Sequence, residues 1–417
     1  MISKPFLYKY PLEKNMKMNK VIVLPGAESQ IPLVQKLKGL GYHVTVFNPY
    51  ENSPAFSYAD DYKLVDILDK EKCLQYAREI HPQGVFSDMC DIAMPTVAFL
   101  SESLGLYSLG KRCASLYTDK WEMRMFCEKH NLPSPRYKLC HTADEAHDFF
   151  DMQDSKCIIK PLDSNSSRGV FTIEKSSDID LYFPYSIAFS KCKKAVLVEQ
   201  YIDGTEFTVD GIMTTNGHRS LAISEKKHYE HNKNIAYELY FSHDNPMYDY
   251  NLLRETNDKY VNLSDLPVGC FTHAEYKWEH GKFYLIEIGA RGGGNFISSD
   301  IVPCMTGLDN YQALIDSVIS QCPIDAHESS ELKNRCAVLY FFDVEREGVV
   351  SSIENEEILK DSRNILRYKF NFQVGDTIKK AENDAARIGY YIAYADTRKE
   401  LVEFMSLINS KVVINVR

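Results

Sequence analysis

Two glutamates and an arginine, in the segment FTHAEYKWEHGKFYLIEIGARGGGN at residues 271–295, are the side chains whose spacing most suggests chemistry. Glu275 and Glu287 lie on two runs of partly alternating apolar residues, and the His-Gly dipeptide between the runs is typical of a hairpin turn. Arg291 follows at the start of a glycine run. In an antiparallel pair both carboxylates would face one side of the sheet, where hard oxygen ligands suit Mg2+. The alternative is a surface hairpin with two solvated glutamates.

Length and composition indicate an ordinary globular chain with two to three domains. It has 417 residues, of which 44% are hydrophobic and 25% are charged. Its net charge of −10 argues against a general affinity for nucleic acid or anionic membrane. Because the sequence contains no long apolar span and its start lacks the features of a signal peptide, we expect a cytoplasmic protein. The 11 cysteines are scattered and form no CxxC motif, which disfavours a disulfide framework or a zinc site.

The first hundred residues alternate between predicted strands and helices. Residues 20–24, 44–47 and 84–88 are short apolar runs, whereas residues 31–40 and 65–79 have helical spacing. This order predicts a parallel sheet with covering helices, a Rossmann-like unit. Because no GxGxxG motif follows a strand, a dinucleotide site is not expected.

Two lysines and a loop of small residues are candidates for binding phosphate. Lys120 begins the predicted helix DKWEMR, and Lys160 ends the apolar run CIIK. The loop that follows contains Ser166, Ser167 and Gly169, and small residues let backbone N–H groups approach an anion closely. The loop lacks the GxxxxGK[ST] pattern. The alternatives are a solvated helix charge and an ordinary flexible turn.

Residues 195–213 are predicted to form two strands joined by an Asp-Gly turn. The first strand ends at Glu199, Gln200 and Ile202, where free backbone groups could match the hydrogen-bonding edge of adenine. Glu206, after the turn, is placed for the hydroxyls of a ribose. The alternative is a hairpin with acidic surface residues.

Residues 225–260 are polar and aromatic with little periodicity, which predicts a long loop followed by a helix. Long loops often contact substrates, so Lys226 and His228 are candidate substrate residues, together with Gly292 and Gly293 of the glycine run. The histidines of the loop complete no known zinc-binding pattern. From residue 335 onward, short strands and a final helix predict a small α+β domain.

Four of these stretches resemble the motifs of the ATP-grasp superfamily, in the same order and over nearly the whole chain: DKWEMR, IIKPLDSNSSRGV, VEQYIDGTEFTVDG and AEYKWEHGKFYLIEIGARGGGN. The tail GDTIKKAENDAARIGYYIAYADTRKELVEFM is similar to the C-terminal domain of biotin-carboxylase-like members, and EIGARGGG resembles the signature of carboxylate–amine ligases, including amino-acid ligases. The resemblance implies α/β and α+β parts: a Rossmann-like N-terminal domain, a two-lobed ATP-grasp domain and a small C-terminal α+β domain. The expected boundaries are an N-terminal extension at 1–18, then domains at 19–115, 116–328 (with a lid at about 140–200) and 329–417.

The resemblance also implies a role for each candidate residue. Lys120 and Lys160 would contact the phosphates of ATP, and residues 164–169 would form a mobile lid over them. Glu199 and the Gln200–Ile202 backbone would hold adenine, and Glu206 would hold the ribose. Glu275 and Glu287 would coordinate Mg2+ (or Mn2+), and Arg291 would stabilise the acyl phosphate or bind the incoming carboxylate. Many members have an asparagine metal ligand where this chain has Gly289. Asn295 is a substitute ligand in this sequence, or the metal keeps an extra water.

The activity implied is an ATP-dependent ligation that releases ADP and phosphate. A small-molecule carboxylate is activated as an acyl phosphate and joined to an amine, such as an amino acid, with Lys160 and Arg291 as catalytic residues. One alternative is a bicarbonate-using carboxylase or a carbamoyl-phosphate-type enzyme, which the C-terminal resemblance favours. The other is a non-catalytic nucleotide-binding subunit, which the complete set of lysines, glutamates and arginine disfavours. Members are often dimers, so a homodimer is compatible with the resemblance.

Overall fold

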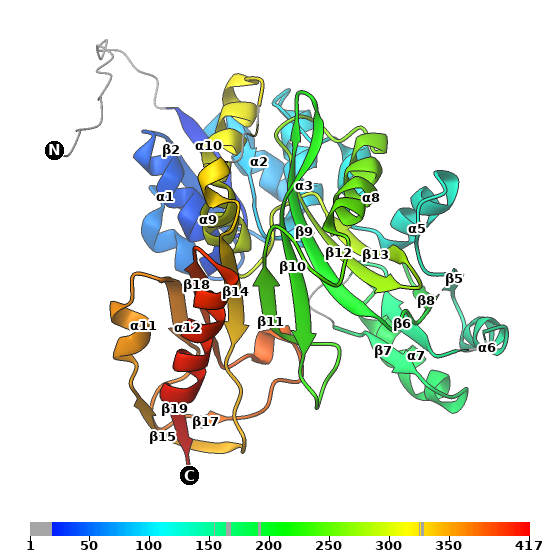
Figure 1. The fold of residues 1–417 in the computed structure, drawn as a ribbon. Helices are drawn as coiled ribbons and strands as arrows, with labels where there is room; N and C mark the ends of the chain where they lie inside the picture. Colours follow the sequence, from blue (N-terminus) through cyan, green and yellow to red (C-terminus); the bar gives the residue numbers. More distant parts are fainter. Residues whose placement is uncertain (1–18, 154, 164–167, 191–192, 325, 327–328) are drawn as a thin grey trace, which may run out of the picture.

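The computed structural model describes residues 19–153, 155–163, 168–190, 193–324, 326 and 329–417 (Figure 1). The N-terminal extension predicted at 1–18 lies outside these residues. The described chain forms four sheets, namely an N-terminal parallel sheet, a small antiparallel sheet, an eight-stranded sheet and a three-stranded sheet near the C-terminus. In Figure 1 the C-terminal part contributes the strands at one end of the eight-stranded sheet, and the small antiparallel sheet lies near the other end.

The N-terminal sheet is parallel with strand order β3-β2-β1-β4, as the alternation of strands and helices predicted. Strands β1 and β4 are apolar and almost wholly buried, which explains why their sequences were recognisable. Strand β3, DYKL, was not predicted because it is a polar and mostly exposed edge strand. The bounds are β1 Lys20–Val23, α1 Ile31–Gly39, β2 His43–Asn48, β3 Asp61–Leu64, α2 Lys70–Ile80, β4 Gly84–Phe86 and α3 Met94–Ser103.

The small antiparallel sheet has strand order β5-β8-β6-β7 and follows two connecting helices. Strand β8 pairs with β5 on one side and with β6 on the other. The prediction that this strand ends at a free sheet edge was therefore wrong. The N–H groups of Gln200 and Tyr201, at its end, donate to the carbonyls of Arg136 and Lys156. The bounds are α4 Lys111–Leu116, α5 Lys120–Lys129, β5 Tyr137–Cys140, α6 Ala143–Asp151, β6 Cys157–Pro161, β7 Phe171–Ile173, α7 Ser177–Ala188 and β8 Val196–Gln200.

The eight-stranded sheet has strand order β13-β12-β9-β10-β11-β14-β18-β16. The long loop predicted from residue 225 onward is in part strand, because β10 extends to His228 and β11 covers Ala236–Phe241. Lys227 and Glu238 face each other across these two strands, with their charged atoms 2.7 Å apart. Because such cross-strand pairs place charges inside a sheet, the segment shows little apolar alternation. The bounds are β9 Thr205–Thr214, β10 Gly217–His228, β11 Ala236–Phe241, α8 Tyr250–Leu263, β12 Phe271–Glu279, β13 Lys282–Gly289, β14 Cys336–Phe341, β16 Ile365–Phe370 and β18 Gly389–Ala395.

The C-terminal part is joined to the central strands through the pair β11–β14, so one sheet crosses the boundary expected near residue 328. The strands β14, β18 and β19 lie on the apolar runs AVLYFF, IGYYIAYA and VVINV, which predicted strands. The final helix α12 lies on the segment TRKELVEFMSLIN, which predicted a helix. The remaining bounds are β15 Gly348–Glu354, α11 Glu357–Asp361, β17 Thr377–Ile378, α12 Arg398–Lys411 and β19 Val413–Val416. Among the described residues, no helix has the length and apolar character needed to cross a membrane.

The segment after β13 packs between the N-terminal sheet and the eight-stranded sheet. It contains α9 Val302–Thr306 and α10 Asn310–Ile315, which lie beside the N-terminal elements in Figure 1. One apolar core contains Val23 and Phe86 of the N-terminal sheet, Ile301 of this segment and Leu339 of β14. Burying apolar surface against both sheets fixes the position of the chain that leaves β13.

The hairpin β12–β13 depends on its glycine. His280 and Gly281 both have positive φ, 49° and 79°, as a two-residue turn of this kind requires. We expect Gly281→Ala to lower the free energy of unfolding by about 1 kcal/mol, because a Cβ is disfavoured at positive φ even though nothing lies within 4 Å of it. Gly39→Ala is the matched control.

Gly39 lies in α1 and also has open space around its Cβ position. Its replacement by alanine should raise the free energy of unfolding by about 0.5–1 kcal/mol. Urea unfolding of both variants measures the two effects. Equal effects at both positions would show that the turn does not impose positive φ.

Candidate functional site

Residues from three parts of the chain line one cavity of about 450 Å3. Two lining residues were missed by the sequence analysis. Asp91, of the N-terminal part, follows strand β4, and Arg387, of the C-terminal part, precedes strand β18. The predicted site residues that line the cavity are Glu206, Lys226, His228, Glu275, Glu287, Arg291 and Asn295. A volume of this size is typical of small-molecule sites.

The two glutamates with which the sequence analysis began lie directly opposite each other. Glu275 of β12 pairs in register with Glu287 of β13, so both carboxylates are on the same face of the hairpin. The side chains are 30% and 34% exposed, and each is held by a lysine. Lys226 lies 2.8 Å from Glu275, and Lys120 lies 2.7 Å from Glu287. Each lysine therefore offsets a negative charge that would otherwise face its neighbour across the strands.

These carboxylates form an acidic pair rather than a larger cluster. Across the part of the chain that the structure describes, no group of three or more His, Cys, Asp or Glu residues is placed to hold a metal ion. Asn295, the proposed third ligand, is exposed on the cavity wall in a left-handed conformation, with φ 50°. Two cavity-facing carboxylates are the donor set that Mg2+ uses when waters and phosphates fill its other positions.

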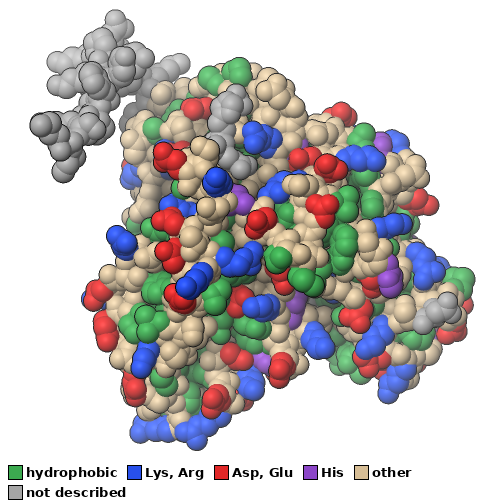
Figure 2. Space-filling model, viewed as in Figure 1, with side chains coloured by type: hydrophobic (Ala, Val, Ile, Leu, Met, Phe, Trp, Pro, Cys, Tyr) green, Lys and Arg blue, Asp and Glu red, His purple; other side chains and the backbone are tan. Residues whose placement is uncertain are grey.

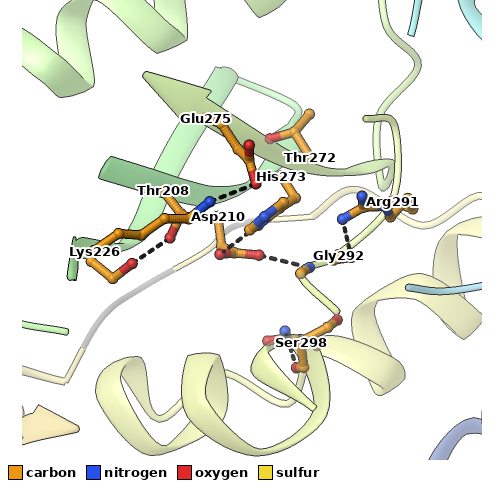
Figure 3. Close-up of polar contacts among 12 residues, drawn as sticks. Thr208, Asp210, Lys226, Thr272, His273, Glu275, Arg291, Gly292 and Ser298 are labelled. Atoms are coloured by element: carbon orange, nitrogen blue, oxygen red, sulfur yellow. Dashed lines mark hydrogen bonds and ion pairs between the residues drawn. The ribbon is translucent and has the colours of Figure 1, made fainter. Parts of the chain in front are cut away.

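Lys226 lies between two carboxylates on the face of the central sheet. Its ammonium group is 2.6 Å from Glu206. It is also 2.8 Å from Glu275, as Figure 3 shows. Burial lowers the pKa of Lys226, but the two carboxylates outweigh that effect and raise it. Burial raises the pKa of Glu206, but Lys226 and the nearby His228 hold that pKa well below its usual range. Glu206 therefore contacts both Lys226 and His228. The predicted roles of Glu206 at the ribose and of Lys226 and His228 at the substrate stay predictions.

A second charged cluster lies buried beneath the start of α5. Arg124 donates from Nε to one oxygen of Glu199 at 2.7 Å, and the Nζ of Lys160 is 2.6 Å from the other oxygen. Arg124 also donates to the backbone carbonyl of Ile286, next to Glu287, at 2.6 Å. The side chains of Arg124, Glu199 and Lys160 are at most 5% exposed. The cluster therefore joins α5 and the small sheet to the hairpin that carries the glutamates.

The pKa values of this cluster follow from burial and pairing. Burial lowers the pKa of Lys160 to about 8, helped by the nearby charges of Arg124 and Lys120 and opposed by Glu199. Burial raises the pKa of Glu199, but Arg124 and Lys160 outweigh it and lower that pKa. Both oxygens of the carboxylate are thus already engaged by cations, and a contact of Glu199 with adenine stays a prediction.

Arg291 is held by a carboxylate from the N-terminal part. Its Nε and a terminal nitrogen donate to the two oxygens of Asp91 at 2.9 and 2.5 Å, a bidentate arrangement. Burial lowers the pKa of Arg291, but Asp91 outweighs burial and raises it. A Cβ at Gly289 would lie 2.3 Å from an Asp91 oxygen, so the glycine makes room for this contact.

Gly292 and Gly293 of the glycine run are tightly packed, whereas Gly294 has open space and lines the cavity. The N–H of Gly292 donates to Asp88 at 2.8 Å, and the N–H of Gly293 donates to Asp210 at 2.7 Å. Asp210 also contacts the imidazole of His273 at 3.0 Å (Figure 3). Cβ atoms at the two glycines would lie 2.1 Å from Ser298 and 2.6 Å from Asp210. The carbonyl of Gly292 also accepts a hydrogen bond from Arg291 at 3.0 Å. Direct contact of either glycine with substrate stays a prediction.

The remaining candidates that the structure describes, Gly169, Gln200 and Ile202, lie in or next to the small sheet. Ser166 and Ser167 lie outside the described residues. Gly169 has φ +76°, and a Cβ there would lie 2.8 Å from the ring of Phe189. The side chain of Gln200 accepts from Arg136 at 3.2 Å, and the carbonyl of the buried Ile202 accepts from Lys277 at 3.2 Å. The assignments of these residues to ATP stay predictions.

Sequence signals existed for some of the residues that were missed. Asp88 is the last residue of a predicted parallel strand and Asp91 lies soon after it, and the carboxyl ends of such strands are where ligand sites form. Arg124 lies one helical turn after Lys120, on the buried side of α5. Arg387 had no comparable signal, because its surroundings are set by chain folding.

Comparison with known proteins gives two matching family models. Residues 153–300 match the model of an ATP-grasp domain, and residues 340–417 match that of L-amino acid ligase C-terminal domain 2. A formate-dependent phosphoribosylglycinamide formyltransferase of Maridesulfovibrio salexigens is 25% identical over 186 residues, which are 44% of this chain and 47% of that protein. The chain thus matches about half the length of such curated relatives.

Two solved structures share the fold over nearly the whole chain. The L-amino acid ligase from Bacillus licheniformis superposes with a TM-score of 0.77 and 20% identity, covering 96% of this chain and 99% of that one. The phosphoribosylglycinamide synthetase from Anaerococcus prevotii has a TM-score of 0.75 and 19% identity, covering 96% and 100%. At these identities the likeness establishes the fold: an N-terminal α/β part, a two-lobed ATP-grasp part and a C-terminal α+β part.

The buried cluster predicts a large stability effect at Glu199. We expect Glu199→Gln to lower the free energy of unfolding by about 3 kcal/mol or more, because it leaves Arg124 and Lys160 buried without a counter-ion. Arg124→Met should cost less, because the pair of Glu199 and Lys160 remains balanced. Urea unfolding measures both variants, with Glu403→Gln on the exposed side of α12 as control.

A Glu199→Gln variant as stable as the wild type would contradict this account. It would indicate that the carboxylate serves a bound ligand instead of two buried cations.

Proposed function

Because the chain carries an ATP-grasp domain, and so belongs to that superfamily, we propose that it is an ATP- and Mg2+-dependent ligase that joins a carboxylate to an amine. The carboxylate would be activated as an acyl phosphate, and ADP and phosphate would be released. One observation carries the proposal: Glu275 and Glu287 lie opposite each other on the wall of a cavity that Arg291 also lines.

The donor set fits a magnesium ion with its nucleotide. Glu275 and Glu287 would hold the ion through carboxylate oxygens, and Lys120 and Lys160 stand close by to offset phosphate charge. When bound, Mg2+ would offset the negative charge that develops on the transferred phosphoryl group.

The residues of the chain would act by positioning and by charge. An oxygen of the substrate carboxylate attacks the γ-phosphorus and ADP leaves; the amine nitrogen then attacks the acyl carbon, phosphate leaves and the nitrogen loses a proton. Arg291 would stabilise the negative charge on the acyl phosphate, and Asp91 would hold its guanidinium in a fixed plane. Enclosure in the cavity would keep water from the reactive acyl phosphate.

The C-terminal part favours an amino acid over bicarbonate as substrate. Its family model is described as the second C-terminal domain of L-amino acid ligases. The bicarbonate-using alternative was favoured by the likeness of this tail to biotin-carboxylase-like members, and the match to an amino-acid ligase model removes that preference. A screen that includes bicarbonate separates the two.

We expect phosphate release from Mg-ATP only when a suitable carboxylate and amine are both present. The screen would combine the common amino acids in pairs and include formate and bicarbonate as carboxylates. Glu287→Gln should abolish the release while the protein stays folded, because it removes one carboxylate from the metal pair. Circular dichroism and the unfolding midpoint check the fold.

Glu403→Gln, on the surface of α12, is the control for the loss of a carboxylate. Full phosphate release by Glu287→Gln would remove this glutamate from the mechanism. A wild type that releases no phosphate with any pair would refute the ligase.

The lowered pKa of Lys160 predicts a pH dependence of ATP binding. Only the protonated amine carries the charge that attracts phosphate, and its pKa is about 8 because the site is buried. Below pH 8 the KM for ATP should therefore be flat, and above pH 8 it should rise by up to about tenfold per pH unit. Lys160→Arg should abolish the rise, because arginine stays charged.

Initial rates at several ATP concentrations between pH 6.5 and 9.5 provide the measurement. The same alkaline rise in Lys160→Arg would assign the titration to another group.

A further inference from the structure

Arg387 is a buried cation on the part of the cavity wall that the C-terminal segment contributes. Its side chain is only 9% exposed, yet it lines the same cavity as Arg291 and Glu275. Neither the sequence motifs nor the proposed chemistry accounts for a second arginine at this site. Burying a guanidinium is costly unless its charge and its N–H groups are satisfied.

The contacts of Arg387 hold it in place but leave part of it unsatisfied. One terminal nitrogen donates to the carbonyl of Ala236 at 2.7 Å and lies 2.7 Å from a carboxylate oxygen of Asp384. The guanidinium carbon lies 3.7 Å from the centroid of the Phe341 ring, so the group is stacked in a fixed plane. Among the residues that the structure describes, its buried Nε has no hydrogen-bond partner.

The charge of Arg387 is also incompletely balanced. Burial lowers its pKa from the usual value, and the attraction of Asp384, Tyr229 and Glu275 does not make up for this. Arg291 differs in this respect, because Asp91 neutralises it through two hydrogen bonds and its pKa is raised. Arg387 is therefore suited to receive an anionic group of a ligand, in addition to the one proposed for Arg291.

We propose that Arg387 binds a carboxylate of the amine substrate, so that the nucleophile is an amino acid held by its own α-carboxylate. The proposal rests on the ligase function proposed above and names the class of its second substrate. A planar guanidinium held by stacking matches a carboxylate in geometry as well as in charge.

This arrangement would keep the carboxylate that is activated apart from the α-carboxylate of the amine substrate, which does not react. The one to be activated belongs near Arg291 and the pair Glu275 and Glu287, where the phosphoryl group is proposed to be transferred. The other must stay unreactive, and an arginine contributed by the C-terminal segment would hold it in a different part of the cavity. The same contact would disfavour ammonia or a simple alkylamine, which offers no anion to Arg387.

The substrate itself provides a test that needs no variant. With wild-type protein, Mg-ATP and one active carboxylate substrate, the KM for glycine or alanine as amine should be at least about tenfold lower than for glycinamide or alaninamide. Because a phosphate ester also carries an anion, 2-aminoethyl phosphate is tested as a third kind of amine. Preference for the free carboxylate over both is the expected result.

Replacing the arginine should remove that preference. Arg387→Met keeps an apolar chain over Phe341 and should raise the KM for the amino acid about tenfold or more, with the KM for its amide and for ATP unchanged. Arg335→Met is the matched control, since Arg335 is also paired with an aspartate and lies over a tyrosine ring but does not line the cavity. It should leave all three KM values unchanged.

Three outcomes would overturn the proposal: equal KM for amino acid and amide, preference for 2-aminoethyl phosphate, or an Arg387→Met variant that loses affinity for the amide as much as for the amino acid. If Arg387→Met does not fold, Arg387→Lys and the wild-type comparison decide. Turnover without a carboxylate preference would refute only the role of Arg387, whereas absence of turnover with any pair would refute the ligase itself.

Discussion

The buried contact of Glu199 with Arg124 and Lys160 is the interaction on which the site geometry depends. It joins three elements that are separate in the sequence: α5, strand β6 and strand β8. Arg124 extends the connection to the carbonyl of Ile286, one residue before a predicted metal ligand. Because a buried carboxylate is stable only when cations compensate its charge, Arg124 and Lys160 must both reach Glu199, and this brings the small sheet and the hairpin together in one arrangement. The position of Lys160 relative to Glu287 follows from this requirement.

A second constraint is the alternation of charge over the central strands. Lys226 compensates Glu206 and Glu275, while Lys120 compensates Glu287. Glutamates placed opposite each other would repel without these lysines, and lysines on a sheet face would be solvated without the glutamates. On the face shown in Figure 2, acidic and basic side chains are interspersed. Each of the three glutamates at the site thus has a lysine within hydrogen-bonding distance, in a chain whose net charge is −10.

The sequence predicted the elements whose patterns are local. The apolar runs of β1 and β4 and the turn between Glu275 and Glu287 could be recognised because burial or backbone conformation selected their residues. Strand β11 was mistaken for loop, since its glutamate is compensated by a lysine on another strand. Glu199 gave no sign that it would be buried, because only the folded chain brings Arg124 within 2.7 Å of it. Local pattern thus predicts elements, whereas compensation between distant charges requires the structure.

Gly289, which stands where many ATP-grasp proteins have asparagine, leaves room for a residue of the N-terminal part at the site. The resemblance places an asparagine here in many ATP-grasp proteins, but in this chain any side chain would begin 2.3 Å from an oxygen of Asp91. That oxygen belongs to the carboxylate that fixes Arg291 through two hydrogen bonds. A larger residue at 289 would therefore displace Asp91 and release the arginine. Glycine at this position and aspartate at 91 therefore act together, and through them the N-terminal part sets the orientation of Arg291.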